Sequence, residues 1–538
     1  MDVPSLPFDF ENEQEFKSRL PKPLVAVVGG LVIAEGIASL SYASGVRMPL
    51  WLDETLTVNI ARLPIGQIPG ALRHDGAPPL FYLLLHFWIG LFGEGNLAVR
   101  MLPTTISAVT LIATFLIVRR IWGNRIGTTT VAILAGAPFF AYYSSECRMY
   151  ALVMLESILL IGALHSAMLN PSRWRLGGVA AVVTALLYTH YWSMYLLFMI
   201  VLWLCWYAWR GVEKASARKV LVAVVAGGVL FLPWVPILLF QLGHTGTPWG
   251  GAQGVSIVVE IFGWFTDNQA ALFQVKSLHA QLLLVSYLAF GALGMFGLAT
   301  QRFTTQLDLH LQRRSRLVTL MAVGTVVVGA TISVVGSSAV TTRYAAVAFI
   351  PFCILLALGI SSFGDKWIRL LFAFGLATVG VWSIHQYHGT ARTQAPKIAS
   401  ALAEYALAGD VVAYCPDQLA PPTLRLLGST SVTSIGYPHF DLNPNLIDWV
   451  DYEAAISKAT PRIFAARLDH LAGPNHRIWL VSQTYASGLH GKCVDLRHEL
   501  DVLRPNGNSV IVYSDVHRYF QPMQLILFPP PEEHVIHP

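Results

Sequence analysis

The chain has 538 residues, of which 54% are hydrophobic and only 12% are charged. A soluble protein carries about 25% charged residues, so this chain has too little polar surface to coat a soluble globule of its size. The net charge of +5 is small, and the basic residues are scattered through short loops. This pattern argues for a membrane protein and against a nucleic-acid partner.

Apolar runs of about 18–22 residues, the length that crosses a bilayer, recur along most of the chain. Residues 1–22 are polar, and the run that follows, residues 23–46, is too long for the apolar part of a cleavable signal peptide. It is therefore predicted to be a retained span. Further spans are predicted at residues 97–118, 127–143, 150–169, 176–188, 193–209, 221–242, 282–300, 317–340, 345–362 and 370–384. The total is about eleven transmembrane helices.

The basic residues predict the orientation of these spans. With the N-terminus in the cytoplasm, each predicted inner loop holds at least two Lys or Arg residues, whereas the short outer loops hold at most one. The apolar run 79–92 is too short to span, and counting it would reverse this pattern. We therefore predict that it lies in the outer interface with residues 55–63, in a multi-pass protein of the plasma (inner) membrane.

From residue 388 onward the chain becomes polar. Short β-rich runs at 411–414, 478–482 and 510–513 alternate with helix-like stretches at 395–408 and 451–458, which predicts a small α/β domain. An odd number of spans puts this domain outside the cell, where Cys415 and Cys493 are a possible disulfide.

The predicted fold class is therefore a polytopic α-helical membrane protein with a C-terminal extracytoplasmic α/β domain. The predicted organisation is a cytoplasmic segment at 1–22, a transmembrane domain at 23–387 and the α/β domain at 388–538. The transmembrane domain includes a first outer loop at 47–96 that carries interfacial helices.

Two polar pairs in the first outer loop are candidates for chemistry. Asp53 and Glu54 follow the first predicted span, where desolvation is expected to raise the pKa of at least one carboxyl and a carboxylate can act as general base. The alternative is a helix N-cap at Asp53 with Glu54 in the first turn. His74 and Asp75 precede two prolines, whose extended turn holds this pair either near Asp53 or in an ordinary polar turn.

Other candidates lie at the predicted outer ends of later spans. Glu146 and Arg148 are costly between apolar spans unless they are paired or hydrated, so they either satisfy each other or Glu146 faces a cleft. Arg343 can hold a phosphate through its planar set of donors, or extend to the interface beside Tyr344 in an aromatic belt.

The pair His190 and Tyr191 also ends a predicted span, and it belongs either to an aromatic belt or to a substrate site. The sequence contains no phosphate-binding Walker loop, no dinucleotide fingerprint, no HExxH motif and no Cys/His metal spacing. Nucleotide hydrolysis and a metal site are therefore not predicted.

Three segments, in this order, carry a resemblance to a known family: residues 51–54, 74–82 and 142–150, with a weaker fourth at 343–344. Together they resemble the membrane glycosyltransferases of the GT-C class. The match is best to the branch that holds the dolichyl-phosphate-mannose protein mannosyltransferases and the bacterial aminoarabinose and lipoglycan transferases. It covers about residues 25–385, and the tail resembles the extracytoplasmic domain of actinobacterial members.

The resemblance implies a role for several candidates. Asp53 matches the proposed catalytic base, and Glu54 matches the second carboxylate of the family's Asp-Glu pair. Glu146 matches an acidic residue that positions the acceptor, and Arg343, with Tyr344, matches a residue that binds the donor phosphate. Weaker substrate-binding roles fall on five further residues: His74, Asp75, Arg148, His190 and Tyr191.

The resemblance also implies the reaction. A sugar, mannose or arabinofuranose, moves from a polyprenyl-phosphate donor to a hydroxyl of a glycan, glycolipid or protein acceptor, with inversion, at the extracytoplasmic face of the lipid membrane. No obligatory cofactor or divalent metal is expected. The alternatives are a lipid or sugar transporter or flippase, which buries ionisable groups near mid-span in broken helices, and a non-catalytic assembly or sensor protein. Charged loops that converge on one cavity would favour the enzyme.

Overall fold

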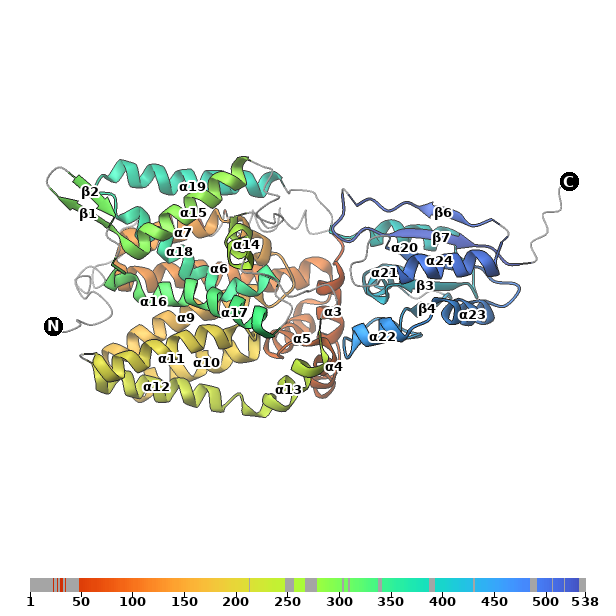
Figure 1. Ribbon diagram of the computed structural model, residues 1–538, viewed down its shortest axis with the longest axis horizontal. Helices are drawn as coiled ribbons and strands as arrows, with labels where there is room; N and C mark the ends of the chain where they lie inside the picture. Colours follow the sequence, from red (N-terminus) through yellow and green to blue (C-terminus); the bar gives the residue numbers. More distant parts are fainter. Residues whose placement is uncertain are drawn as a thin grey trace.

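The computed structural model contains a helical bundle joined to an α/β domain (Figure 1). It describes residues 48–211, 213–246, 256–266, 278–301, 304–307, 310–336, 341–386, 392–428, 431–483, 491–505, 507–516 and 518–531, with a few single positions between 23 and 34. The predicted cytoplasmic segment 1–22 and nearly all of the predicted first span lie outside the described residues.

Eight helices among the described residues are long and apolar enough to cross a membrane. Five are α6 (Asn96–Trp122), α9 (Tyr150–Leu169), α11 (Ser193–Arg210), α15 (Leu278–Phe296) and α19 (Lys366–Gln386). Three are built from successive helical segments: α12 (Lys214–Val229) with α13 (Val235–His244), α16 (Arg316–Thr319) with α17 (Thr325–Gly336), and the turn η7 (Thr342–Ala345) with α18 (Ala346–Ser361). The predicted polytopic fold class is confirmed.

A ninth span results if α7 (Asn124–Ala135) and α8 (Pro138–Ser144), which meet at a 67° bend, are counted as one. The bend has a local cause. Pro138 cannot donate a backbone hydrogen bond and disfavours a helical residue before it, and Ala137 is extended. Helix α10 (Arg173–Thr189), predicted as a span, has 17 residues.

The predicted span 282–300 is wrong at its end. Helix α15 stops at Phe296, and strand β1 (Leu298–Gln301) then pairs antiparallel with β2 (Thr304–Leu307). Gly297 adopts a positive φ of 78°, a conformation that ends helices. The apolar residues after it continue the hydrophobic run, so composition alone did not reveal the break.

The predicted first outer loop contains α3 (Leu52–Ala61), η2 (Ile65–Gln67), α4 (Ile68–Asp75) and α5 (Leu80–Phe92). Helix α5 has 13 residues and is about 20 Å long, well short of a bilayer core of about 30 Å. It packs against α3 and α6. These helices lie at the end of the bundle that faces the α/β domain (Figure 1).

The C-terminal domain is built on a five-stranded sheet in the order β4 (Thr433–Gly436), β3 (Val411–Cys415), β5 (Ile478–Ser482), β7 (Gln524–Phe528) and β6 (Ser509–Val512). Strands β4, β3 and β5 are parallel, and β7 and β6 run antiparallel to their neighbours. Helices α20 (Ala395–Tyr405) and α21 (Ala420–Leu427) pack on one face of the sheet. Helices α22 (Tyr452–Lys458), α23 (Pro461–Ala472) and α24 (Lys492–Leu503) pack on the other.

The α/β domain rests on the first outer loop. Trp51, Leu52 and Leu56 are part of the hydrophobic core on the α22–α24 side of the sheet. Asn59 Nδ2 also donates a 2.8 Å hydrogen bond to the carbonyl of Asn445. Within the domain, Cys415 and Cys493 form a disulfide. The junction places α3, which carries Asp53 and Glu54, between bundle and domain.

Candidate active site

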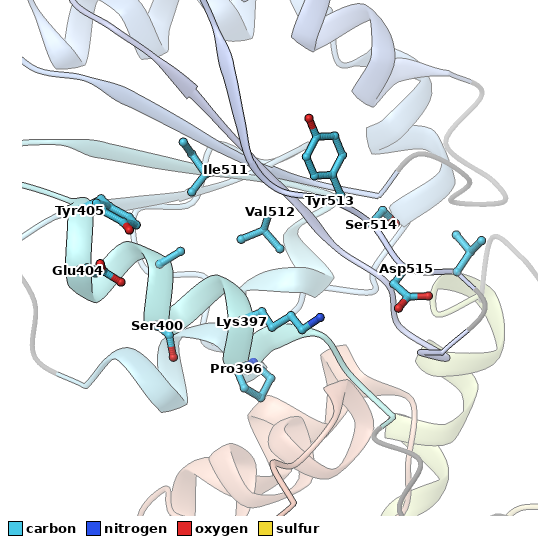
Figure 2. Close-up of a pocket in the computed structure, with 12 residues that line it drawn as sticks. Pro396, Lys397, Ser400, Glu404, Tyr405, Ile511, Val512, Tyr513, Ser514 and Asp515 are labelled. Atoms are coloured by element: carbon cyan, nitrogen blue, oxygen red, sulfur yellow. The ribbon is translucent and has the colours of Figure 1, made fainter.

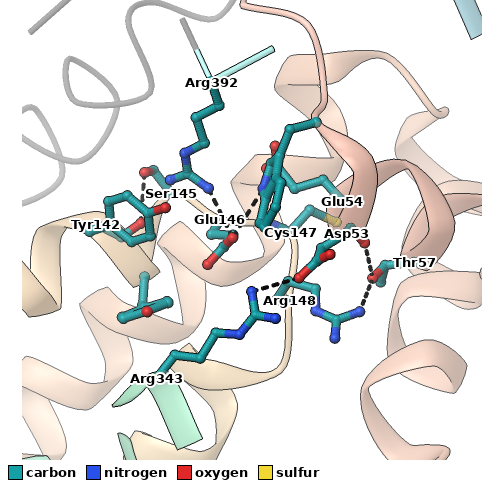
Figure 3. A network of polar contacts seen from close by, with 12 residues as sticks. Asp53, Glu54, Thr57, Tyr142, Ser145, Glu146, Cys147, Arg148, Arg343 and Arg392 are labelled. Atoms are coloured by element: carbon teal, nitrogen blue, oxygen red, sulfur yellow. Dashed lines mark hydrogen bonds and ion pairs between the residues drawn. The ribbon is translucent and has the colours of Figure 1, made fainter. Parts of the chain in front are cut away.

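Asp53 and Arg343 form an ion pair at the end of the bundle that faces the α/β domain. Arg343 Nη1 donates to Asp53 Oδ2 at 2.7 Å, and the two side chains are only 23% and 16% exposed (Figure 3). The buried Nε of Arg343 has no hydrogen-bond partner among the described residues. The N-cap of α3 is Trp51, so Asp53 lies inside the first turn and the N-cap interpretation is wrong. One donor of Arg343 therefore remains available for a ligand.

Glu54 has a different environment from its neighbour. It is fully buried, and Arg100 Nε and Nη2 donate to its two oxygens at 2.9 and 2.7 Å. The backbone N–H of Cys147 adds a third bond at 3.0 Å. Burial alone raises a carboxyl pKa, but the charge and hydrogen bonds of Arg100 outweigh it and hold the pKa of Glu54 below its usual value. The expected raised pKa is wrong at this residue, which joins α3 to α6.

Glu146 accepts hydrogen bonds from two side chains that lie far away in sequence. Trp51 Nε1 and Arg392 Nη1 donate to its Oε1 at 3.1 and 2.9 Å, and the Arg392 guanidinium also lies 3.8 Å from the centre of the Tyr142 ring (Figure 3). The buried Oε2 has no partner among the residues described. Burial raises the pKa of Glu146, against the effect of Arg392. The alternative that Glu146 and Arg148 satisfy each other is wrong.

Arg148 connects Asp75 to the same network. Its Nη1 donates to Thr57 Oγ1 at 2.9 Å and to the Tyr82 hydroxyl at 3.3 Å. The Tyr82 hydroxyl in turn donates to Asp75 Oδ2 at 2.9 Å. Burial raises the pKa of Asp75, although Arg148 opposes the shift. Asp75, one of the two residues predicted to lie near Asp53, therefore lies close to the surface that carries Asp53, as expected.

His74 turns away from this network. Its Nδ1 lies 2.8 Å from Asp448 Oδ1 in the α/β domain, and both side chains are half exposed. His244 makes a similar contact with Asp451, at 3.1 Å. These two pairs lie at the rim where the α/β domain meets the bundle.

A cavity of about 900 Å³ opens beside the network, between the bundle and α22. Its bundle wall includes Arg148, Tyr150, His190, Tyr191 and Tyr344. The His190 ring packs between Tyr150 and Tyr344, with ring centres 5.9 and 5.4 Å away. Burial, helped by Arg148 and Arg343, lowers the pKa of His190 to about 3, so this imidazole is neutral near pH 7.

Tyr191, the other half of that predicted pair, is more distant from the ion pairs. Its hydroxyl donates to Gln241 Oε1 and accepts a 3.0 Å hydrogen bond from Trp234 Nε1. Gln241 Nε2 donates to the carbonyl of Leu72 at 2.7 Å. These hydrogen bonds hold Tyr191 in place on the side of the cavity away from the ion pairs.

Two arginines that form ion pairs in the site, Arg100 and Arg392, were not predicted from the sequence. Arg100 lies inside the predicted span 97–118, where a charge is costly without a partner, and that cost was the signal for a buried acid nearby. Arg392 lies just beyond the last span in a polar stretch, so nothing local distinguished it. Each forms an ion pair with a predicted candidate carboxylate: Arg100 with Glu54 and Arg392 with Glu146.

The arrangement of charges also bears on the transporter alternative. The break between α7 and α8 falls at Gly136 and Ala137 and places no ionisable side chain there. The charged candidates instead converge from the first outer loop, the loop before α9 and the turn before α18 (Figure 3). Within the described residues, no group of three His, Cys, Asp or Glu side chains is placed to hold a metal ion.

Comparisons with known proteins agree with this architecture. Residues 76–237 match the family model described as dolichyl-phosphate-mannose-protein mannosyltransferase. No curated protein sequence matches the chain. The structure is similar to ArnT from Cupriavidus metallidurans in the apo state, with 12% identity, a TM-score of 0.54 and coverage of 93% of this chain and 98% of that chain.

ArnT bound to undecaprenyl phosphate gives a TM-score of 0.53 at 13% identity, with coverage of 94% and 98%. The Archaeoglobus fulgidus oligosaccharyltransferase tethered to an acceptor peptide gives 0.50 at 10% identity, with coverage of 90% and 72%. At these identities, the structural likeness establishes the fold. This chain is therefore a multi-pass membrane protein with a fold like that of these two proteins, and the mannosyltransferase family model matches less than a third of its 538 residues.

Proposed function

We propose that this protein transfers a sugar from a polyprenyl-phosphate donor to an acceptor hydroxyl at the extracytoplasmic face of the membrane. The observation that carries the proposal is the ion pair between Asp53 and Arg343 beside a cavity large enough for two substrates. A carboxylate and a guanidinium in contact are a base for the acceptor and a phosphate ligand for the donor.

The donor phosphate and Asp53 bind different edges of the Arg343 guanidinium. The free Nε and the neighbouring Nη2 form one edge and bind two phosphate oxygens in a bidentate contact, while Nη1 keeps its contact with Asp53 Oδ2. Donor binding in this way places the leaving phosphate beside the base. Tyr344 follows Arg343 and lines the cavity, where it contacts the donor headgroup.

Asp53 then accepts the proton of the acceptor hydroxyl. The acceptor oxygen attacks the anomeric carbon on the side opposite the phosphate, and the bond from that carbon to the phosphate oxygen breaks. The product has inverted configuration, and polyprenyl phosphate leaves with the electron pair. Arg343 balances the charge that develops on the phosphate, which is the preorganised electrostatic stabilisation that often contributes most to catalysis.

Glu54 and Glu146 support this chemistry from outside the reacting atoms. Glu54 holds α3 on α6 through Arg100, and Glu146 holds Trp51 and Arg392 beside the site. The free Oε2 of Glu146 can accept a hydrogen bond from the acceptor. No obligatory divalent metal is proposed, because Arg343 and Arg148 supply positive charge near the leaving phosphate.

The similar proteins support the substrates. ArnT is solved with undecaprenyl phosphate, and the oligosaccharyltransferase with an acceptor peptide, which favours a lipid-linked donor and a separate acceptor for this chain as well. Mannose is the first sugar to test because of the matched family model, and arabinofuranose is the second. The acceptor is a glycan, glycolipid or protein hydroxyl.

We also propose that the N-terminus is cytoplasmic and that the α/β domain is extracytoplasmic, in the plasma (inner) membrane. The disulfide between Cys415 and Cys493 supports this orientation, because disulfides persist in oxidising compartments. The proposed organisation is a cytoplasmic segment at residues 1–22, a transmembrane domain at 23–387 and an extracytoplasmic domain at 388–538.

The test uses purified protein in nanodiscs with synthetic polyprenyl-phosphate donors that carry mannose, arabinofuranose or aminoarabinose. We expect transfer from one donor, with inverted configuration by NMR and a rate unaffected by EDTA. Asp53→Asn should lower turnover about 10²- to 10⁴-fold. The matched control Asp448→Asn alters a half-exposed carboxylate at the rim and should leave turnover near normal. Near-normal turnover of Asp53→Asn would rule out Asp53 as the base. If the wild-type protein transfers no sugar from any donor, the proposed function is overturned.

A further inference from the structure

The cavity beside the ion pair has a second wall, which comes from the α/β domain. That wall is a strip of residues along α22 and its N-cap: Asp451, Tyr452, Glu453, Ala454 and Ser457. The exposed polar side chains in this strip are two carboxylates, Asp451 and Glu453, and the hydroxyl of Ser457. Among the lining residues that the structure describes, Arg148 is the only Arg or Lys, and it lies on the opposite wall. That wall also carries Asp75, whereas the α22 wall carries carboxylates and no Arg or Lys among its described lining residues.

We propose that this strip is the acceptor subsite, and that it selects a hydroxyl compound that is uncharged or basic, and rejects a phosphorylated one. The inference rests on the proposed function and specifies its acceptor. Carboxylates accept hydrogen bonds from sugar hydroxyls and amines, whereas they repel phosphate groups. The donor phosphate belongs at the opposite wall, with Arg343 and Arg148.

The strip is held firmly in place. Tyr452 is 1% exposed, and its hydroxyl donates to Asp417, while Ile456 is buried in the domain core. On the bundle side, the backbone N–H of Asp451 donates to the carbonyl of His244 at 2.8 Å. Because both sides are anchored, the side chains of Glu453 and Ser457, one helical turn apart, are presented at fixed positions to the cavity.

Unpaired polar atoms on the opposite wall indicate where a ligand lies. The hydroxyl of Tyr150 is buried and has no hydrogen-bond partner in the described part of the chain, and the same is true of Arg148 Nε. Both residues line the cavity, and Tyr150 is only 1% exposed. Buried polar groups are normally hydrogen-bonded, so unpaired ones that line a cavity point to a polar ligand between the two walls.

A second hollow of about 950 Å³ offers a natural control. It lies on the α/β domain between α20 and the residues of and after β6, and Figure 2 shows Lys397, Glu404 and Asp515 along it. Its lining mixes a lysine with carboxylates, and all of the described residues in it belong to the α/β domain. Glu404 is an exposed domain carboxylate like Glu453 and differs from it in the cavity that it lines.

The experiment compares three alkyl glycosides of one sugar as acceptors: unmodified, with one added amine and with one added phosphate. With the wild-type protein, we expect the KM of the phosphorylated compound to be at least about tenfold higher than that of the other two. Glu453→Gln should raise the KM of the unmodified acceptor about tenfold and leave both kcat and the donor KM unchanged. Glu453→Lys should remove the discrimination against phosphate.

Glu404→Gln is the matched control and should change none of these values. An equal rise in acceptor KM with Glu404→Gln would move the acceptor to the other hollow and overturn the inference. Equal use of phosphorylated and unmodified acceptors, unaffected by Glu453→Lys, would also overturn it while leaving the proposed function intact. If no acceptor is glycosylated with any donor, the proposed function itself fails.

Discussion

Asp53 and Arg343 lie 290 positions apart in the chain, and yet Arg343 Nη1 donates to Asp53 Oδ2 at 2.7 Å. This contact joins the first outer loop to the start of the span that contains α18. In the absence of a donor, the two charges neutralise each other in a site where both side chains are mostly buried. An isolated charge in such a place is costly, so each residue stabilises the other.

Substitution of Arg343 should separate the effect of charge from that of geometry. Arg343→Gln removes the charge, and we expect kcat/KM for the donor to fall about 10²- to 10³-fold. Arg343→Lys keeps the charge but loses the planar set of donors, so the loss should be intermediate. Steady-state kinetics with the lipid-linked donor measure both, and equal losses for the two variants would contradict a bidentate phosphate contact.

The contact between Glu54 and Arg100 should matter for stability. Glu54→Gln leaves the buried Arg100 without a counter-charge, and we expect the free energy of unfolding to fall by about 3 kcal/mol. Thermal unfolding in one detergent measures the change. Glu94→Gln is the control, because its pair with Arg62 is about half exposed and should contribute less than about 1 kcal/mol. Similar losses in both variants would argue against a special role for the buried pair.

Glu146 and Glu54 should respond differently to pH. Burial raises the pKa of Glu146 above the unfolded value of 4.5, so its ionisation costs stability. That cost is absent below the unfolded pKa and grows as pH rises through the folded pKa. The melting temperature of Glu146→Gln relative to the wild type should therefore increase as pH rises from 4.5.

The pKa of Glu54 is shifted the other way, because Arg100 outweighs the effect of burial. Its contribution to stability is complete above 4.5 and is lost only as pH falls through the lower folded pKa. The deficit of Glu54→Gln should stay constant from about pH 5.5 to 7.5 and shrink only under more acidic conditions. A pH-independent difference for Glu146→Gln would contradict the effect of burial on that residue.

The disulfide should stabilise the α/β domain in particular. Cys415 and Cys493 enclose a sequence separation of 78 residues, and replacing both with Ala should lower the domain's free energy of unfolding by about 2–4 kcal/mol. Limited proteolysis should show earlier cleavage in the α/β domain and unchanged cleavage in the bundle. Cys205→Ala, which alters an exposed free cysteine, should have no effect. Equal resistance in all three proteins would show that the bond is dispensable.

Local patterns in the sequence were sufficient for the class of fold. Long apolar runs indicated the spans, a short one indicated that α5 does not cross the membrane, and three β-rich runs located β3, β5 and β6. These features depend on residues a few positions apart, which is the range over which periodicity and composition act. Strands β4 and β7 were not predicted, although they are as long as the predicted strands, because their pairing with β3 and β5 is defined only in the folded sheet.

The same limit applied to the site. The sequence by itself identified Asp53, Glu54, Glu146 and Arg343 as candidate site residues, because charges beside apolar spans are costly without partners. Only the tertiary structure decided the partners: Arg100 for Glu54, Arg392 for Glu146 and Arg343 for Asp53. It also decided that α22 of the distant α/β domain forms one wall of the cavity. Ion pairs and cavities join segments that are remote in the chain, so they depend on how the helices pack and not on the residues next to them.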